Sequence, residues 1–89
     1  MDTEVLIKEQ LKEQLKDLNE IILFNDDVNT FDWVIESLVE ICDHDPLQAE
    51  QCAVIVHYKG KCGVKTGEYH ELEPMCSALL ERGLSAEIA

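Results

Sequence analysis

The sequence predicts an α+β domain in which three helices cover a three-stranded antiparallel sheet, in the order β-α-α-β-α-β. Two patterns lead to this prediction. Short runs of apolar and branched residues, which are typical of buried strands, alternate with segments whose apolar residues recur every three or four positions, which is typical of helices. Glycine and proline separate these segments. With 89 residues, the chain is long enough for one domain with a small core.

The first predicted strand and helix lie on either side of a polar stretch. The run EIILF, residues 20–24, suits a buried strand because it is almost entirely apolar and branched. From Phe31 onward the apolar residues recur at helical spacing, and Asn29 or Thr30 can cap this helix. The polar residues between the two elements therefore form a connection between a strand and a helix.

A second helix is predicted to follow almost at once. The segment 44–46, HDP, breaks the first helix because a proline disfavours a helical residue before it. Pro46 fits the first turn of a new helix, and Asp45 can serve as its N-cap. We therefore expect the second helix to run from Pro46 to about His57.

The remaining chain is predicted to form a strand, a helix and a strand. The glycine-rich stretch YKGKCGVKTG indicates a turn and a short strand near residues 61–65. Apolar residues between Leu72 and Leu80 restore helical spacing, and Gly83 is expected to end that helix. The last residues, LSAEIA, alternate like a final strand.

Residues 1–18 are assigned to an N-terminal extension outside the folded domain, which we place at residues 19–89. The extension is highly charged, and Leu11, Leu15 and Leu18 stand at helical spacing. It is expected to be either an amphipathic helix that frays or a mobile arm.

The charge of the chain limits its partners. Nineteen acidic residues against seven basic residues give a formal net charge of −12, which repels phosphate backbones and anionic membrane surfaces. We therefore expect no nucleic-acid or membrane partner and favour a cationic one. No apolar run approaches the roughly 20 residues of a membrane span, and the start MDTEVLIKEQ lacks the features of a signal peptide. A cytoplasmic monomer is expected.

The four cysteines are expected to be structural. Cys42, Cys52, Cys62 and Cys76 are separated by ten, ten and fourteen positions, whereas zinc sites usually bring cysteines in close pairs. Disulfides are not expected in a reducing cytosol, and cysteine is among the most buried residue types. We interpret three of them as small core residues and Cys62, beside Gly63, as the one that can be exposed. No metal and no cofactor is expected.

Several motifs together resemble a known family. The stretch FNDDVNTFDWVIESL is followed by AVIVHYKGKCGVKTG and then by an acidic residue. These residues resemble the ClpS family, the adaptors that deliver N-degron substrates to the Clp ATP-dependent protease. That family typically shows an N-D-D loop after the first strand, a V-H-Y-x-G-K segment closing the second helix, and a C-G-V strand. The resemblance spans residues 20–89, apart from a short gap between Lys61 and Cys62.

The resemblance implies a site for the α-amine of a substrate's first residue. An α-amino group has a pKa of about 7.7 to 8.0, so at neutral pH it is mostly a cation with three donors and needs acceptors. By the resemblance Asn25, Asp26 and Asp27 supply these acceptors, and His57 completes the hydrogen bonding. Asp26 has a second possible role, which is to meet the next backbone group of the substrate. Taken alone, the acidic residues suggest helix caps or solvated charges, and His57 suggests a core or capping residue.

The resemblance also implies a hydrophobic pocket for the first side chain, with specificity for Phe, Tyr, Trp or Leu. Where the family commonly has methionine at the pocket mouth and deeper in the second helix, this chain has Phe31 and Ala53. The rigid ring is expected to exclude first residues branched at Cβ, and the small alanine is expected to deepen the pocket. Taken alone, these apolar residues suggest ordinary core. The implied pocket walls are Asn29, Phe31, Val34, Ala53, Val56 and Ile88.

A separate surface is implied for docking to the ATPase. Glu68 matches the acidic residue with which family members dock on the N-terminal domain of the Clp AAA+ ATPase. The basic residue that the family shows five positions later is replaced here by Glu73. The resemblance is therefore incomplete at the docking surface.

Other functions remain as alternatives. A hydrolase could pair His57 with Asp27, but no serine or cysteine nucleophile stands beside them in a motif, so no enzymatic activity is expected. A divalent cation could bind the acidic loop, although calcium loops place oxygens at alternate positions around a central glycine and this stretch does not. A ClpS-like fold that binds a different ligand is the third alternative.

Overall fold

The predicted order of elements is confirmed. The computed structural model describes residues 18–89, so the predicted extension, apart from Leu18, lies outside the described residues. The elements are β1 (Asn19–Phe24), α2 (Phe31–Cys42), α3 (Pro46–Lys59), β2 (Lys61–Gly67), α4 (Tyr69–Glu81) and β3 (Ser85–Ile88).

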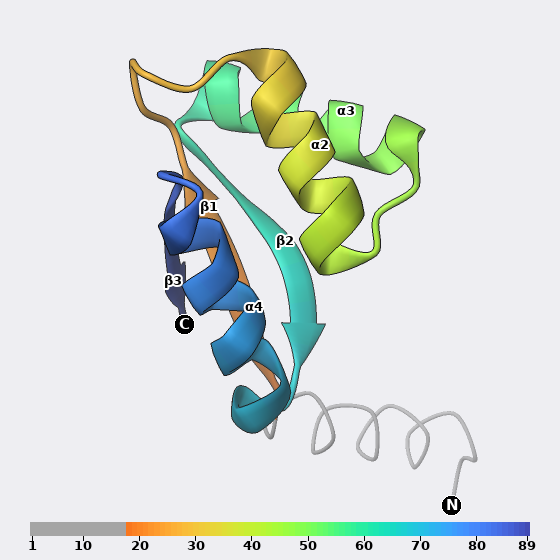
Figure 1. Ribbon diagram of the computed structural model, residues 1–89, viewed down its shortest axis with the longest axis vertical. Coiled ribbons are helices and arrows are strands. Elements are labelled where there is room, and N and C mark those ends of the chain that lie inside the picture. The colour runs from red at the N-terminus through yellow and green to blue at the C-terminus, as the bar shows by residue number, and fades with distance from the viewer. Residues whose placement is uncertain (1–17) are drawn as a thin grey trace, which may run out of the picture.

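The register of the sheet decides which loops meet. The strand order is β2-β1-β3, with β1 in the centre and both pairs antiparallel. Phe24, the last residue of β1, stands opposite Lys61 at the start of β2 and Ser85 at the start of β3. The loop after β1 and the turns before β2 and β3 therefore share one end of the sheet, at the top of Figure 1.

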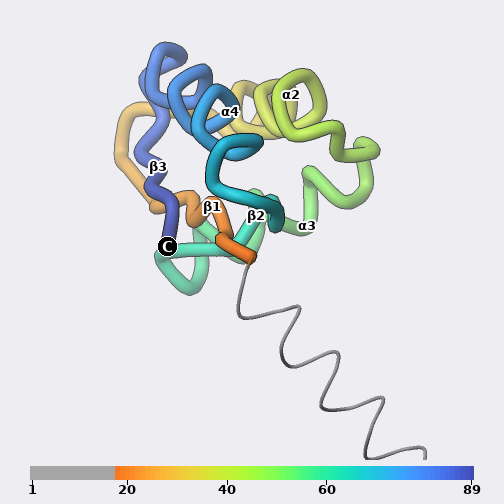
Figure 2. Tube along the Cα trace, turned by 90° about the horizontal axis from the view of Figure 1, so that it is seen from below, coloured from red at the N-terminus to blue at the C-terminus, as the bar shows by residue number. Residues whose placement is uncertain are grey.

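The helices form a layer around the sheet and enclose the core. Figure 2 shows α2 and α4 side by side over the sheet, and α3 packs against α2 and the edge strand β2. Alternate residues of β1, Ile21 and Leu23, are fully buried, as period-two packing of a sheet face requires. They meet buried leucines of the helices, so one small core holds all layers together: Leu38, Leu72 and Leu79.

Helices α2 and α3 begin at the predicted caps. The side chain of Thr30 accepts a hydrogen bond from the Trp33 backbone N–H at 3.2 Å, and Asp45 accepts one from Gln48 N–H at 2.9 Å. Helix α3 extends to Lys59, two residues past the predicted end. Nothing breaks the helix before Gly60, whose left-handed φ of 91° ends it.

Strand β2 is also longer than predicted and contains a bulge. It continues past Lys65 to Gly67, and Val64 is the extra residue where the pairing with β1 shifts register. The Val64 carbonyl accepts a hydrogen bond from Nε2 of the buried His44. Since a carbonyl only accepts, His44 carries a proton on Nε2. His44 thus fixes the α2–α3 turn to the bulge.

The cysteines divide by burial into two pairs. Cys42 and Cys76 are buried, whereas Cys52 and Cys62 are both partly buried, and all four are free thiols. Burial raises the pKa of both the Cys42 and the Cys52 thiol to about 11. These two thiols are therefore poorly reactive near neutral pH. Among residues 18–89, no helix is long and apolar enough to cross a bilayer.

Candidate functional site

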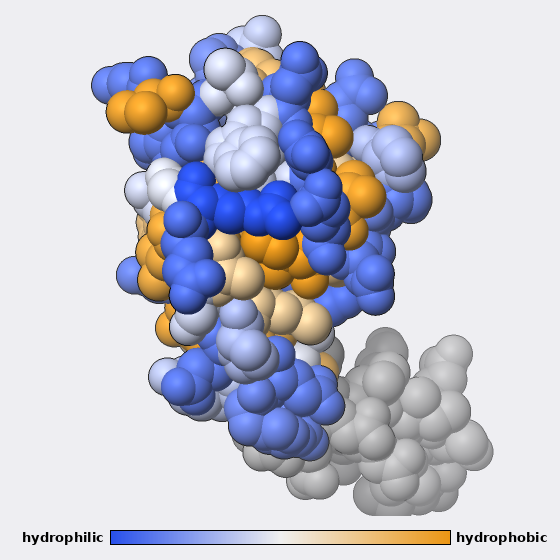
Figure 3. All heavy atoms as spheres, viewed as in Figure 1, coloured by the Kyte–Doolittle hydropathy of each residue, from blue (hydrophilic) through white to orange (hydrophobic). Residues whose placement is uncertain are grey.

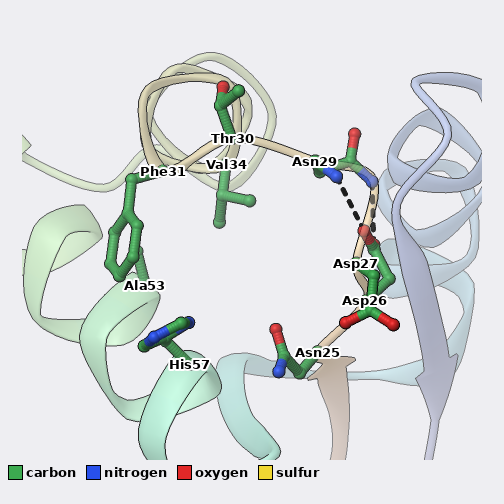
Figure 4. A pocket seen from close by; sticks show the side chains of 9 residues that line it. All are labelled: Asn25, Asp26, Asp27, Asn29, Thr30, Phe31, Val34, Ala53 and His57. Atoms are coloured by element: carbon green, nitrogen blue, oxygen red, sulfur yellow. Dashed lines mark hydrogen bonds between the residues drawn. The ribbon is translucent and has the colours of Figure 1, made fainter.

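A cavity of about 310 Å³ opens at the end of the sheet where the three connections meet. Figure 4 shows the loop after β1 on one side of it, the start of α2 above, and α3 on the other side. The cavity brings together eight of the ten residues predicted to bind a substrate's first residue and adds Thr30. Its lining is Asn25, Asp26, Asp27, Asn29, Thr30, Phe31, Val34, Ala53 and His57.

The polar side of the cavity offers oxygen acceptors. Asn25 and Asp27 are exposed, and within residues 18–89 their side-chain oxygens accept no hydrogen bond. His57 is also exposed and faces the cavity from α3. A ligand cation entering here therefore meets a carboxylate, an amide oxygen and an imidazole that can bind it without first breaking an internal hydrogen bond.

Asp26 differs from Asp27 because its carboxylate holds the loop in shape. Its Oδ1 accepts hydrogen bonds from the backbone N–H groups of Val28 at 2.9 Å and Asn29 at 2.8 Å, and Oδ2 accepts one from Asn29 Nδ2 at 2.8 Å. Partial burial acts to raise the pKa of Asp26, but these hydrogen bonds outweigh it and lower the pKa below its usual value. Asp26 is thus a positioning residue, with little capacity left for a ligand.

Two glycine turns hold the ends of this loop. The Asn25 backbone N–H donates to the Gly60 carbonyl at 2.9 Å, and Asn29 Nδ2 donates to the Gly83 carbonyl at 2.9 Å. Both glycines are left-handed, with φ of 91° and 84°, a conformation that other residues rarely adopt. The ends of α3 and α4 therefore fix the loop at both ends.

The first turn of helix α2 is also fixed, by contacts with Arg82 in the connection between α4 and β3. Trp33 Nε1 donates to the Arg82 carbonyl at 3.0 Å, and the Arg82 guanidinium lies 5.3 Å from the centre of the Trp33 ring. Arg82 also pairs with Glu40 and reaches the buried Ser37 hydroxyl at 3.4 Å. These contacts set the position of the helix that carries the apolar wall.

The apolar side of the cavity has a rigid mouth and a small floor. Phe31 is 41% exposed, whereas Ala53 is 4% exposed, so the ring stands at the opening and the alanine lies deep. Val34 lines the wall between them. The ring centres of Phe31 and His57 are 5.1 Å apart. The cavity thus combines an apolar recess with polar groups at its rim.

Two predicted wall residues, Val56 and Ile88, do not line this cavity, and the sheet register explains the position of Ile88. Ile88 pairs with Ile21, at the far end of β3 from the loop, so its assignment to the pocket wall is corrected. Leu84, just before β3, takes that place: with Val56 it lines a small inner cavity of about 20 Å³ next to the main one. By alternation, Leu84 and Ile88 lie on the same face of the final strand. Only the antiparallel register shows that Leu84 is at the cavity end and Ile88 at the opposite end. Thr30, interpreted only as a cap, lies between two predicted wall residues.

The predicted docking residue lies at the opposite end of the sheet. Glu68 follows the last residue of β2 and precedes α4, and its carboxylate is 3.3 Å from Nδ1 of the exposed His70. Figure 3 shows that this lower end of the molecule is mostly hydrophilic. Within residues 18–89, one group of side chains has its ligand atoms close enough together for a metal: Glu68, His70 and Glu71, which are all exposed. The acidic loop is not such a group.

Comparisons with known proteins agree with this architecture. A model of the family described as ATP-dependent Clp protease adaptor protein ClpS matches residues 14–87. The adapter protein ClpS of Nitratidesulfovibrio vulgaris is 36% identical over 72 residues, covering 79% of this chain and 70% of that protein. ClpS of Escherichia coli O127:H6 is 37% identical over 75 residues, covering 80% of this chain and 71% of that protein.

A solved structure shares the fold. Agrobacterium tumefaciens ClpS2 bound to L-phenylalaninamide superposes with a TM-score of 0.75, covering 82% of this chain and 95% of that one at 20% identity. The family model alone spans most of the chain, and the relatives exceed 30% identity over about four fifths of it. The chain therefore belongs to the ClpS family, whose members are adaptors of the ATP-dependent Clp protease and are not themselves proteases.

Proposed function

We propose that this adaptor binds the free α-amine and the large hydrophobic first residue of N-degron substrates and delivers them to a Clp protease. The observation that carries the proposal is the division of one cavity into a polar rim and an apolar recess. An N-terminal residue needs both the polar rim and the apolar recess, because its ammonium group and its side chain are attached to the same Cα atom. We assign the amine to Asn25, Asp27 and His57, and the side chain to Phe31 and the apolar residues behind it.

Asp26 has a separate role in this proposal. Since both of its oxygens are engaged by the loop, it keeps Asp27 and Asn25 in position and adds negative charge near the amine. The alternative of a divalent cation on the acidic loop is less favourable for the same reason, because Asp26 would have to give up three hydrogen bonds. The hydrolase alternative also lacks support: the one hydroxyl in the lining is that of Thr30, which caps α2.

The strength of binding follows from the groups involved. Two or three charge-assisted hydrogen bonds contribute about 1.5 to 3 kcal/mol each, and burial of a Leu or Phe side chain contributes about 1.5 to 3 kcal/mol. Association entropy opposes them by at least several kcal/mol. Micromolar or somewhat tighter affinity is the result, which suits a carrier that must release its cargo.

The ligand of the structural neighbour supports the same chemistry. L-phenylalaninamide, bound to ClpS2 of A. tumefaciens, carries a free α-amine and an aromatic side chain. We propose that substrates with N-terminal Phe, Tyr, Trp or Leu bind this chain through the same two groups, the free α-amine and the first side chain. We also propose that Glu68 contributes to docking on the N-terminal domain of the Clp ATPase.

A titration with matched peptides tests the proposal. Fluorescence anisotropy would compare a short peptide that begins with Phe, its N-acetylated form, and the same peptide with Gly in first place. Acetylation removes the positive charge and two donors, so we expect at least a hundredfold loss, and replacement by Gly should also weaken binding strongly. Similar affinities for the free and acetylated peptides would show that the cavity does not recognise an α-amine.

A further inference from the structure

Helix α3 is apolar on the face that it turns to solvent as well as on the face that it buries. Ala49, Ala53 and Val56 pack inward, as expected for an amphipathic helix. The outer face carries four large side chains, each at least 40% exposed: Leu47, Val54, Ile55 and Tyr58. A helix that is apolar on its solvent face is unusual for a domain this small, and such a face commonly contacts another chain.

This outer face forms a shallow and open depression along the helix. A groove of about 350 Å³ is lined by three of these apolar residues and two polar ones, and we refer to it as the α3 groove: Leu47, Glu50, Gln51, Val54 and Ile55. Glu50 is its one charged residue. Together with the net charge of −12, it favours an occupant that is apolar or basic and disfavours an acidic one.

The α3 groove lies beside the cavity at the end of the sheet, on a neighbouring face of the same helix, and the two share no lining residue. Ala53 and His57 line the cavity one turn apart on the helix, and Figure 4 shows both on its α3 side. The residue after each of them, Val54 and Tyr58, lies about 100° further round the helix, on the groove side. The Tyr58 ring meets the His57 ring edge-on, with centres 5.0 Å apart. An apolar surface therefore begins beside the imidazole assigned to the amine.

The distance from the cavity residue His57 to the far end of the α3 groove at Leu47 fits a short stretch of extended peptide. From His57 back to Leu47 is 10 residues (57 − 47), or about 15 Å along the helix axis at 1.5 Å per residue. An extended chain covers this distance with about four or five residues. We infer that the α3 groove receives the substrate residues that follow the first one, and that apolar side chains there add to affinity. This inference rests on the proposed function of the cavity.

Two peptides with the same first residue separate the groove from the cavity. Phe-Gly-Gly-Gly-Gly offers only the amine and the first side chain, whereas Phe-Val-Leu-Val-Gly also offers apolar side chains to the groove. By anisotropy, with a fluorophore at the C-terminus of each, the second peptide should bind the wild-type protein about tenfold more tightly. The double variant Leu47→Ser/Val54→Ser should remove this preference and leave the affinity for Phe-Gly-Gly-Gly-Gly unchanged.

A matched control and three further outcomes complete the test. Leu80→Ser changes an exposed leucine on α4, remote from α3, and should keep the tenfold preference. Equal affinity of both peptides for the wild-type protein, with binding still dependent on the free amine, would overturn the inference while the proposed function stands. Equal binding of acetylated and free Phe-Val-Leu-Val-Gly would also overturn it. Failure of every Phe peptide to bind would overturn the proposed function and the inference together.

Discussion

The two ends of the sheet differ in how firmly their connecting segments are held. At the cavity end, hydrogen bonds to the carbonyls of Gly60, Arg82 and Gly83 fix the loop and the start of α2. At the other end, Glu68 caps no backbone N–H and meets only an exposed histidine. The cavity end is built to hold a few polar groups in a fixed arrangement, whereas the far end presents charges to solvent.

This difference separates two kinds of recognition. Binding one residue requires acceptors and an apolar recess in fixed relative positions, because misplaced hydrogen bonds contribute little. A charged docking surface tolerates mobile side chains, because exposed charges act over several ångströms and are screened by salt. The residues that carry the resemblance to the family are present at the cavity end, apart from Phe31 and Ala53, whereas at the far end Glu73 stands where the resemblance implies a basic residue.

The largest expected effect on peptide affinity is at Asp27, the acceptor whose negative charge has no hydrogen-bond partner within residues 18–89. Asp27→Asn keeps the shape of the side chain and removes its charge, so we expect peptides with a free N-terminal Phe to bind about 10- to 100-fold more weakly. Glu68→Gln removes one charge from the far end and is the matched control, which should leave peptide affinity nearly unchanged. Equal losses in both variants would show that net charge, and not the position of Asp27, determines binding.

The shape of the apolar recess should determine which first residues bind. Ala53→Met fills the floor, and overpacking typically costs about 1 to 3 kcal/mol, so N-terminal Trp should lose more affinity than Leu. Phe31→Ala opens the mouth and should admit Ile and Val, which the wild type is expected to bind poorly. Anisotropy with Phe, Tyr, Trp, Leu, Ile and Val peptides measures the ranking. If the order is the same in all three proteins, Phe31 and Ala53 do not determine specificity.

The fold could be predicted from sequence because each element has a local cause. Pro46 and Asp45 start α3, Gly60 ends it, and the apolar run of residues 20–24 identifies β1 as a buried strand. These signals act within a few residues, so no knowledge of the tertiary structure is needed. The bulge at Val64 and its contact with His44 depend on residues 20 positions apart, and no local pattern indicates them.

The site was predictable to the extent that its residues lie close in sequence. The loop residues and the face of α3 with Ala53 and His57 follow from the motif and from helical spacing. The different roles of Asp26 and Asp27 do not, because neighbouring carboxylates look alike until their hydrogen bonds are known. Ile88 was placed in the pocket by the resemblance, and the error became visible only in the register of β3, which pairs Ile88 with Ile21.

A smaller effect is expected where the loop is tied to the α4–β3 turn. Asn29→Ala removes the side-chain bonds to Asp26 and the Gly83 carbonyl, which should lower the free energy of unfolding by about 1 to 2 kcal/mol. Asn25→Ala is the matched control, because the bond from Asn25 to Gly60 uses the backbone and survives. Urea denaturation measures both. If the two variants are equally stable, the side-chain bonds of Asn29 contribute nothing to holding the loop.

The smallest effects are expected at the far end, where exposed charges act. The Glu68 side chain is 60% exposed, and an ion pair at such a position typically contributes about 0.2 to 1 kcal/mol. Glu68→Lys should therefore weaken association with the N-terminal domain of the Clp ATPase by severalfold at most, and less at high salt.

Glu73→Lys restores the charge that the family shows there, so it should strengthen the same association. Isothermal titration with the isolated ATPase domain measures both variants, and peptide affinity should stay constant in each, since the two ends of the sheet share no side chains. Loss of peptide binding in Glu68→Lys would mean that this residue supports the fold, and an unchanged ATPase affinity in both variants would place the docking surface elsewhere.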